Sequence, residues 1–328
     1  MYFIRFVFII GSFIIRLLKN KYTATKHAQS LIAAISKENE GKLDDFTYNK
    51  IVSSHNLYIT IMFDAFVRLR GRNTSLKEKT RSIHYFICSS LFDNFWDNKS
   101  HTLEELSQMS FNTQHYQPKN FDDTVFVQSH LFLLDEVNDK AGYVDVSHKV
   151  FNAQAASLQQ FNPNITNEQI QAITFAKGGN SVLLCKYYLD IQSSQEESEC
   201  WFLIGTLIQL GNDLFDIYKD SQQQIQTLGT RCTNAYELEK IYLQQVRKIQ
   251  ALIKKMPFPT FRKTEFSVSL AATYTLGMVA LHQLKQTQGK NNQLPNLQTV
   301  ERKALIVDMQ KVRNLLRWLT FIYKEAKL

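Results

Sequence analysis

Apolar residues recur at helical spacing along almost the whole chain, three and four positions apart. The strict alternation of apolar and polar residues that is typical of a half-buried strand does not occur. The pattern therefore predicts an all-α protein, a helical bundle of about twelve helices. The expected helices span residues 2–18, 22–38, 44–70, 77–97, 102–109, 122–139, 146–160, 167–191, 197–220, 234–255, 263–287 and 297–326.

Proline and glycine support this division of the chain. There are only 11 glycines and 5 prolines, and the prolines fall between the periodic segments. Such residues mark the positions where helices end. No Gly/Ser-rich linker separates the helices, so we expect one helical domain at 21–328, preceded by an apolar helix at 1–20.

The segment 212–220 carries oxygen donors four residues apart on one predicted helix. Asn212, Asp216 and Asp220 would form a short ladder on one helix face, because four residues complete slightly more than one turn. Two carboxylates and an amide suit a hard divalent cation such as Mg²⁺. The sequence therefore predicts metal ligands at these three positions.

A second acidic pair, Asp93 and Asp97, has the same spacing and lies among aromatic residues. Carboxylates in apolar surroundings need a compensating positive charge, which is either a metal ion or a Lys or Arg partner. With two such acidic helices in one chain, we prefer the metal.

Together the motifs resemble the two metal-binding motifs of class I isoprenoid synthases. The segment 212–220 matches the NxxxDxxxD form of squalene and phytoene synthases. It also resembles the NDxx(S/T)xxxE form of terpene cyclases, with Asp216 in place of Ser/Thr and Asp220 in place of Glu. The pair Asp93 and Asp97 resembles the aspartate-rich motif, which precedes the second motif in that superfamily as it does here.

The resemblance implies a helical bundle around a central active-site cavity, which binds three Mg²⁺ ions and a prenyl diphosphate. It makes Asp93, Asp97, Asn212, Asp216 and Asp220 the expected metal ligands and catalytic residues. The candidate diphosphate contacts are Lys177, Lys219, Arg231, Arg313 and Arg317. The candidate cavity lining is Phe92, Phe95, Gly178 and Gly179.

The Gly178-Gly179 pair lies inside a predicted helix. Thr166 and Gln169 are expected to form a capping box at the start of this helix. Two glycines weaken a helix, so they mark either a break or a close approach of two backbones. Terpene cyclases have a helix break at a comparable place.

The chain departs from the cyclase pattern elsewhere, since no arginine occurs between Arg81 and Arg231 to act as the diphosphate sensor; Lys177 is the candidate replacement.

Charge and cysteine usage narrow the class of protein. The net charge of +8 favours polyanionic partners such as diphosphates, but no nucleic-acid-binding motif accompanies the basic residues. The four cysteines lack the spacing of a zinc site and are interpreted as reduced core thiols of a cytoplasmic protein. A homodimer is left open.

Residues 1–18 are strongly apolar but include Arg5 and Arg16. The stretch is marginal for a membrane span and lacks the cleavage site of a signal peptide. We expect an uncleaved helix, and we prefer packing on the core of the protein to peripheral contact with a membrane.

Three functions remain open. The preferred one is a terpene synthase, a lyase that ionises a C15 or C20 prenyl diphosphate. The first alternative is a head-to-head prenyl synthase of the squalene or phytoene type. The second is a non-catalytic helical protein that acts at a membrane surface or in protein interactions, in which the acidic residues have no metal-dependent role.

Overall fold

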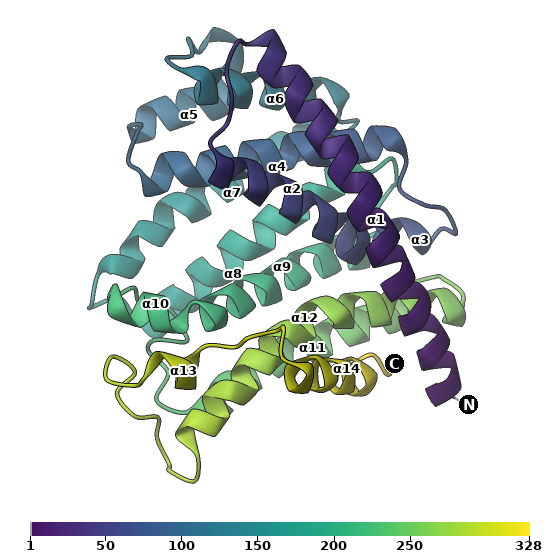
Figure 1. Cartoon of the computed structure of the whole chain (residues 1–328), viewed down its shortest axis with the longest axis vertical. Helices are drawn as coiled ribbons and strands as arrows, with labels where there is room; N and C mark the ends of the chain where they lie inside the picture. The colour runs from purple at the N-terminus through teal and green to yellow at the C-terminus, as the bar shows by residue number, and fades with distance from the viewer. Residues whose placement is uncertain (1) are drawn as a thin grey trace. The chain divides into compact units, whose positions relative to one another are not determined.

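The computed structural model describes residues 2–328, and helices are the only regular secondary structure in that range (Figure 1). The all-α prediction is confirmed. The chain divides into two compact units. Unit 1 comprises the residues up to Tyr143 together with Tyr187–Ile191, and unit 2 comprises Val144–Lys186 and Gln192–Leu328.

Unit 1 begins with a long helix, and the helices that follow are short to medium in length. They are α1 (Tyr2–Glu38), α2 (Asp45–Tyr58), the π-helix η1 (Ile59–Phe63), α3 (Asp64–Arg68), α4 (Leu76–Asp97), α5 (Leu103–Phe111), the 3-10 helix η2 (Thr113–His115) and α6 (Phe121–Glu136). Helix α7 (Lys140–Ser157) begins in unit 1 and ends in unit 2.

Helix α1 corrects the prediction of two helices at 2–18 and 22–38. The intervening residues include neither Gly nor Pro, so nothing in them breaks the helix. Asn20 lies at this point and donates hydrogen bonds to Thr60 Oγ1 at 3.0 Å and Asp64 Oδ2 at 2.8 Å. These bonds attach the middle of α1 to η1 and α3. No helix within residues 2–328 meets the length and apolarity needed to cross a membrane.

Unit 2 contains the remaining helices. They are the 3-10 helix η3 (Leu158–Phe161), α8 (Asn167–Leu184), α9 (Gln195–Phe215), α10 (Ile217–Gln222), α11 (Ala235–Lys255), α12 (Thr260–Gln288), α13 (Arg302–Leu305) and α14 (Val312–Glu325). The 3-10 helix η4 (Cys185–Tyr188) begins in unit 2 and ends in unit 1.

The predicted helix at 297–326 is wrong, because the chain forms α13 and α14 with a turn between them. Asp308 accounts for the turn. Its side chain accepts a hydrogen bond from the Gln310 backbone at 2.9 Å, and its carbonyl accepts one from Asn314 Nδ2 at 2.9 Å. Asp commonly stabilises a turn in this way, by offering the backbone an alternative to helical hydrogen bonds.

Capping boxes fix the start of several helices. The predicted pair Thr166 and Gln169 forms one at the start of α8, which confirms that expectation. Equivalent pairs start α4, α5 and α9. Each box satisfies backbone N–H groups that the first helical turn leaves without partners.

Helix α8 runs unbroken through Gly178 and Gly179, so the first of the two alternatives, a helix break, does not occur. The glycines instead allow α8 and α9 to approach closely. A Cβ atom on Gly178 would collide with the backbone carbonyl of Gly205, and a Cβ on Gly179 would collide with the ring of Phe202. The tight-packing interpretation of the glycine pair is therefore correct.

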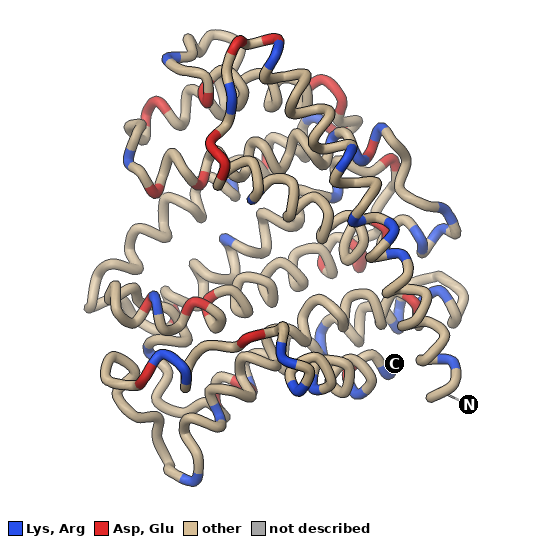
Figure 2. Tube along the Cα trace, viewed as in Figure 1, with Lys and Arg blue, Asp and Glu red and all other residues tan. Residues whose placement is uncertain are grey.

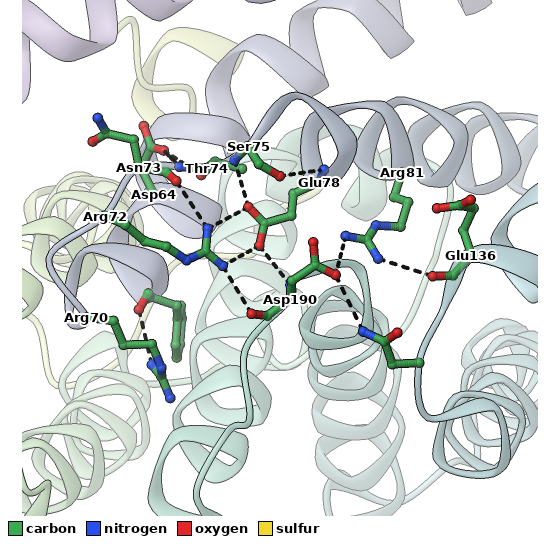
Figure 3. A network of polar contacts seen from close by, with 12 residues as sticks. Asp64, Arg70, Arg72, Asn73, Thr74, Ser75, Glu78, Arg81, Glu136 and Asp190 are labelled. Atoms are coloured by element: carbon green, nitrogen blue, oxygen red, sulfur yellow. Dashed lines mark hydrogen bonds and ion pairs between the residues drawn. The ribbon is translucent and has the colours of Figure 1, made fainter.

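A polar network holds the segment Tyr187–Ile191 within unit 1 (Figure 3). Arg72 donates two hydrogen bonds to the buried carboxylate of Glu78, at 2.8 and 2.6 Å. Glu78 also accepts a hydrogen bond from the Asp190 backbone at 2.7 Å, and the fully buried Arg81 forms an ion pair with Asp190 at 2.7 Å. Arg72 and Arg81 therefore have structural roles in unit 1.

Candidate metal-binding and diphosphate site

The acidic residues of unit 2 lie where α9 passes into α10. Helix α9 ends at Phe215, and the backbone of Asp216 leaves the helical region, with φ −90° and ψ 3°. Its N–H still donates to the Asn212 carbonyl at 2.8 Å, and Asp220 N–H donates to the Asp216 carbonyl at 2.8 Å. The predicted single helix at 197–220 is therefore two helices that bend at Asp216.

Three carboxylates come together at this bend, and we call Asp213, Asp216 and Asp220 the acidic stripe. Asp213 and Asp220 are buried, with 8% and 9% of their surface exposed, whereas Asp216 is exposed. They lie close enough across the bend to interact electrostatically, since Asp216 acts on the pKa of both Asp213 and Asp220. Asn212 is exposed and precedes the stripe.

Asp213 is the member that the sequence prediction missed as a site residue. The ladder of Asn212, Asp216 and Asp220 assumed equal steps of four residues along an unbroken helix. Two signals pointed to Asp213: it follows Asn212 directly, and it lies seven residues before Asp220. In the structure the two buried carboxylates interact, since the charge of Asp213 helps to raise the pKa of Asp220.

The acidic stripe contains more negative charge than its surroundings neutralise. Burial raises the pKa of Asp213 to about 6, although a hydrogen bond from Gln209 and the charge of Lys177 act in the opposite direction. Burial, followed by repulsion from Asp213 and Asp216, raises the pKa of Asp220 to about 7. Desolvation and like charges both disfavour the ionised form, and a bound cation would reverse both effects.

Helices α8 and α9 each contribute a hydrogen-bond donor to Asp213. Thr174 Oγ1 donates to Asp213 Oδ2 at 3.5 Å, and Gln209 Nε2 of α9 donates to Asp213 Oδ1 at 2.8 Å. Lys177 of α8 is half-buried and lowers the pKa of both Asp213 and Asp220 through its charge. The close approach at Gly178 brings Lys177 to this position.

The oxygen ligands at the acidic stripe are of the kind that Mg²⁺ binds, but the stripe alone does not form a complete metal site. Within residues 2–328, no three His, Cys, Asp or Glu side chains are placed to hold a metal ion together. Carboxylate and amide oxygens at Asn212, Asp216 and Asp220 are ligands that Mg²⁺ accepts. Since Mg²⁺ in such sites also takes oxygens from substrate phosphates, the residues fit a metal that binds together with its substrate.

The first motif lies in unit 1 at the end of α4. Asp93 is half-exposed and forms an ion pair with Lys50 of α2 at 3.0 Å. Its positive partner in this structure is therefore a lysine, the alternative to a metal ion. Asp97 is exposed and is the last residue of α4. Asn94 Nδ2 donates to Thr47 Oγ1 at 2.7 Å, which fixes the same turn of α4 to α2. That this motif faces the acidic stripe stays a prediction.

The two aromatic candidates beside Asp93 differ in their surroundings. Phe95 is 4% exposed and packs on His101 and Phe126, with ring centroids 4.6 and 5.9 Å away. It is a core residue of unit 1. Phe92 is half-buried and contacts Trp96 and Phe126, so it is the ring of the pair with more exposed surface.

The basic candidates are not all equivalent. Lys219 of α10 and Arg313 of α14 are exposed. Arg231 donates to the carbonyl of Pro163 at 3.0 Å and to Gln226 at 3.4 Å, so it fixes two loops of unit 2. Arg317 donates to Asn314 Oδ1 at 3.0 Å. Of the five, only Lys177 and Lys219 act on the pKa of a residue in the acidic stripe.

Comparison with known proteins adds no identification. No known protein family matches the chain, and no curated protein is similar to it. The family resemblance of the two motifs therefore stays a prediction.

Proposed function

We propose that the protein is a Mg²⁺-dependent class I terpene synthase that ionises a single prenyl diphosphate. The observation that carries the proposal is the acidic stripe, in which three carboxylates cluster beside one lysine. Two of them are buried with raised pKa values. Perturbed carboxylates that share a site are characteristic of functional positions.

The stripe supports a metal-dependent function because its charge is unbalanced. At neutral pH Asp220 is only partly ionised, since its pKa is about 7. A divalent cation would favour the ionised form and displace the proton, so binding would couple to proton release. When bound, Mg²⁺ supplies charge stabilisation for the leaving diphosphate. Asp216, Asp220 and Asn212 are the residues that would hold it in unit 2.

Lys177 is assigned a contact with the diphosphate. It is half-buried and lies within electrostatic reach of the stripe. A cation held there from α8 can neutralise phosphate oxygens without moving far, and a preorganised charge of this kind stabilises a leaving group well. It takes the place of the arginine sensor that this chain lacks between Arg81 and Arg231.

The reaction would begin with cleavage of the bond between the allylic carbon and the diphosphate oxygen. The electron pair leaves with the diphosphate, and an allylic cation remains on the hydrocarbon. The cation then either loses a proton to the released diphosphate or adds water, whose extra proton the diphosphate accepts. Aromatic side chains such as Phe92 can stabilise the cation through their faces, which requires that water be excluded.

A head-to-head synthase is the second candidate, and helix α8 favours it. The terpene-cyclase resemblance implied a break in the helix before the Asn/Asp motif, whereas α8 is continuous from Asn167 to Leu184. The segment 212–220 also satisfies the NxxxDxxxD form completely. Such an enzyme would join two prenyl diphosphates rather than transform one.

We also propose a cytoplasmic location. Cys88, Cys185 and Cys200 are buried and Cys232 is half-buried, all as thiols. Thiols persist in the reducing environment of the cytoplasm.

The test is a product assay on the purified 328-residue chain with Mg²⁺ and C10, C15 or C20 prenyl diphosphate. We expect release of diphosphate and formation of a C15 or C20 hydrocarbon or alcohol. Asp216→Asn should abolish both, whereas Asp145→Asn should leave them unchanged, since Asp145 forms an exposed ion pair with Lys149 on α7.

Calorimetry supplies an independent readout of the same site. Titration of Mg²⁺ with a non-hydrolysable prenyl diphosphate analogue should release protons in the wild type and fewer protons in Asp220→Asn. No product from any of the three substrates, together with no binding of Mg²⁺ and analogue, would support the non-catalytic alternative.

A further inference from the structure

Helix α1 exposes a row of large apolar side chains over its first six turns. Phe8 is 75% exposed, Ile15 67%, Leu18 64% and Ile4 63%. Val7 and Tyr22 are also exposed. We call these six residues the exposed apolar face of α1. Single exposed apolar residues are ordinary, but a contiguous row of this kind marks a contact surface.

The six residues share one side of the helix. Their positions are spaced three, four and seven residues apart, which is the period of an α-helix. A different side of α1 carries Phe6, Ile10 and Phe13, which are buried. The helix therefore has two apolar sides, and the fold of the protein uses only one of them.

Basic residues border the exposed apolar face, and no acidic residue precedes Glu38. Lys19 and Lys26 lie along one edge, Lys21 lies along the other edge, and all three are exposed. Arg5 is exposed near the start of the helix. Figure 2 shows this run of basic positions along α1, with acidic positions only at its C-terminal end.

We propose that α1 binds to an anionic membrane surface, lying in the plane of the interface with the exposed apolar face inserted among the lipids. Apolar side chains flanked by lysine and arginine are the pattern of an interfacial helix. The apolar side chains partition into the acyl boundary while the basic side chains reach the headgroups. Anionic lipid is the partner whose charge complements this helix.

A second copy of the chain fits the same surface less well. Two identical faces would bring the same lysines and arginines together, with no acidic residue on residues 1–37 to pair with them. Like charges at a contact oppose association. An anionic lipid surface instead attracts each of these residues.

The fold holds α1 firmly enough to present this face. Asn20 donates to Thr60 and Asp64, and Asn56 Nδ2 donates to Thr25 Oγ1 at 2.7 Å. At the far end, the side-chain amides of Asn39 and Gln128 exchange two hydrogen bonds, at 2.8 and 2.9 Å. The second half of α1 is thus anchored to unit 1, and the exposed apolar face reaches the membrane as part of the folded protein.

The test measures binding of the 328-residue chain to vesicles by co-sedimentation. The vesicles consist of phosphatidylcholine alone or of phosphatidylcholine with phosphatidylserine. We expect strong binding only when phosphatidylserine is present, and weaker binding at high salt because salt screens the lysine and arginine charges.

Paired variants test the two parts of the surface. Phe8→Ser with Ile15→Ser should lower binding at least about tenfold, since two large apolar side chains no longer insert. The control, Phe46→Ser with Phe261→Ser, removes two other exposed phenylalanines and should bind like the wild type. Lys19→Gln with Lys26→Gln should lower binding about fivefold for each charge removed. Lys99→Gln with Lys290→Gln is the matched control.

All these positions are exposed, so the variants should keep the helical circular dichroism and melting temperature of the wild type. Equal binding by the α1 variants and their controls would overturn the proposal. So would the absence of binding to phosphatidylserine vesicles. Concentration-dependent dimers that Phe8→Ser with Ile15→Ser abolishes, without any vesicle binding, would instead assign the face to a second copy.

Discussion

At the scale of single residues, the two acidic motifs show how one residue type acquires different properties from its surroundings. Asp93 is half-exposed and pairs with Lys50 at 3.0 Å. Asp220 is buried, near two other carboxylates, and its pKa is about 7. An exposed pair contributes little to stability, whereas a buried carboxylate beside two like charges is a cost that function can explain.

Asp220→Asn should stabilise the protein at high pH. The pKa of Asp220 is about 7 when folded and near its ordinary value when unfolded, so the wild type loses stability as pH rises from about 4 to 7. Asn has a similar shape and no charge. The gain in the free energy of unfolding should grow across this window, to at most about 4 kcal/mol because solvent screens part of it, and then stay constant.

The measurement is the free energy of unfolding at pH 4, 6 and 8 in the presence of a chelator. Asp145→Asn, which removes an exposed carboxylate of α7, serves as the control. A variant that is less stable than the wild type at pH 8 would show that the Asp220 anion has a stabilising partner.

Glu78→Gln should have the opposite effect on stability. Burial would raise the pKa of Glu78, but hydrogen bonds from Arg72 and from two backbone N–H groups lower it to about 2. A lowered folded pKa stabilises the protein above the unfolded pKa of about 4.5, and this stability is lost as pH falls toward 2. We expect a loss of about 3 kcal/mol at neutral pH.

Acid unfolding distinguishes this effect from a general one. The wild type should lose stability between pH 4.5 and 2 more steeply than Glu78→Gln, because the variant lacks the titrating group. Glu237→Gln, which removes an exposed partner of Lys240, should retain the wild-type slope. Identical slopes for all three proteins would contradict the assignment.

At the scale of elements, the contact between α8 and α9 determines which polar groups of unit 2 come together. Gly178 and Gly205 let the two backbones approach, and Phe202 fills the space beside Gly179. Thr174 and Lys177 thereby come into reach of Asp213. The glycine pair therefore affects the candidate site indirectly, because it sets the position of α8 and does not break that helix.

Gly178→Ala should separate α8 from α9 and destabilise the protein by about 2 kcal/mol, since the new methyl group would collide with backbone atoms. The raised pKa of Asp213 should fall toward its ordinary value as water enters. Gly211→Ala in α9 is the control, because its Cβ would meet Gly277 Cα at an ordinary 3.6 Å. Thermal unfolding of the two variants side by side checks this prediction.

The helices could be predicted from the sequence where local signals agree. The capping box of Thr166 and Gln169 begins α8 as expected, and α4, α11 and α12 lie close to their predicted ranges. The prediction failed where a single side chain decides the backbone. Asp308 turns the chain before α14, and the backbone of Asp216 ends α9 within the predicted helix at 197–220.

The candidate site was predicted in part for the same reason. Asp216 and Asp220 were identified from their spacing, because residue types and helical period are visible in a sequence. Asp213 was missed because its burial depends on α8, which packs against it from elsewhere in the chain. The Lys50 partner of Asp93 was equally invisible, since it comes from a different helix.

At the scale of the whole molecule, the reaction type is the prediction that separates the two enzyme classes. A cyclase uses one prenyl diphosphate, and a head-to-head synthase uses two. We expect diphosphate release that is first order in a single substrate, unaffected by NADPH and dependent on Mg²⁺. Initial rates across substrate concentration, with mass analysis of the product, check this. A C30 or C40 product would favour the head-to-head synthase.

The short segment Tyr187–Ile191 has a consequence for how the chain folds during its synthesis. It belongs to unit 1, although the residues on both sides of it belong to unit 2. Until Asp190 leaves the ribosome, Arg81 lacks its carboxylate partner and Glu78 lacks one of its backbone donors. At translation rates of about 5–20 residues per second, unit 1 must wait several seconds for this piece. A chain cut after Tyr143 would carry a buried arginine without its counter-charge, so the first part of the protein cannot mature before the second is under way.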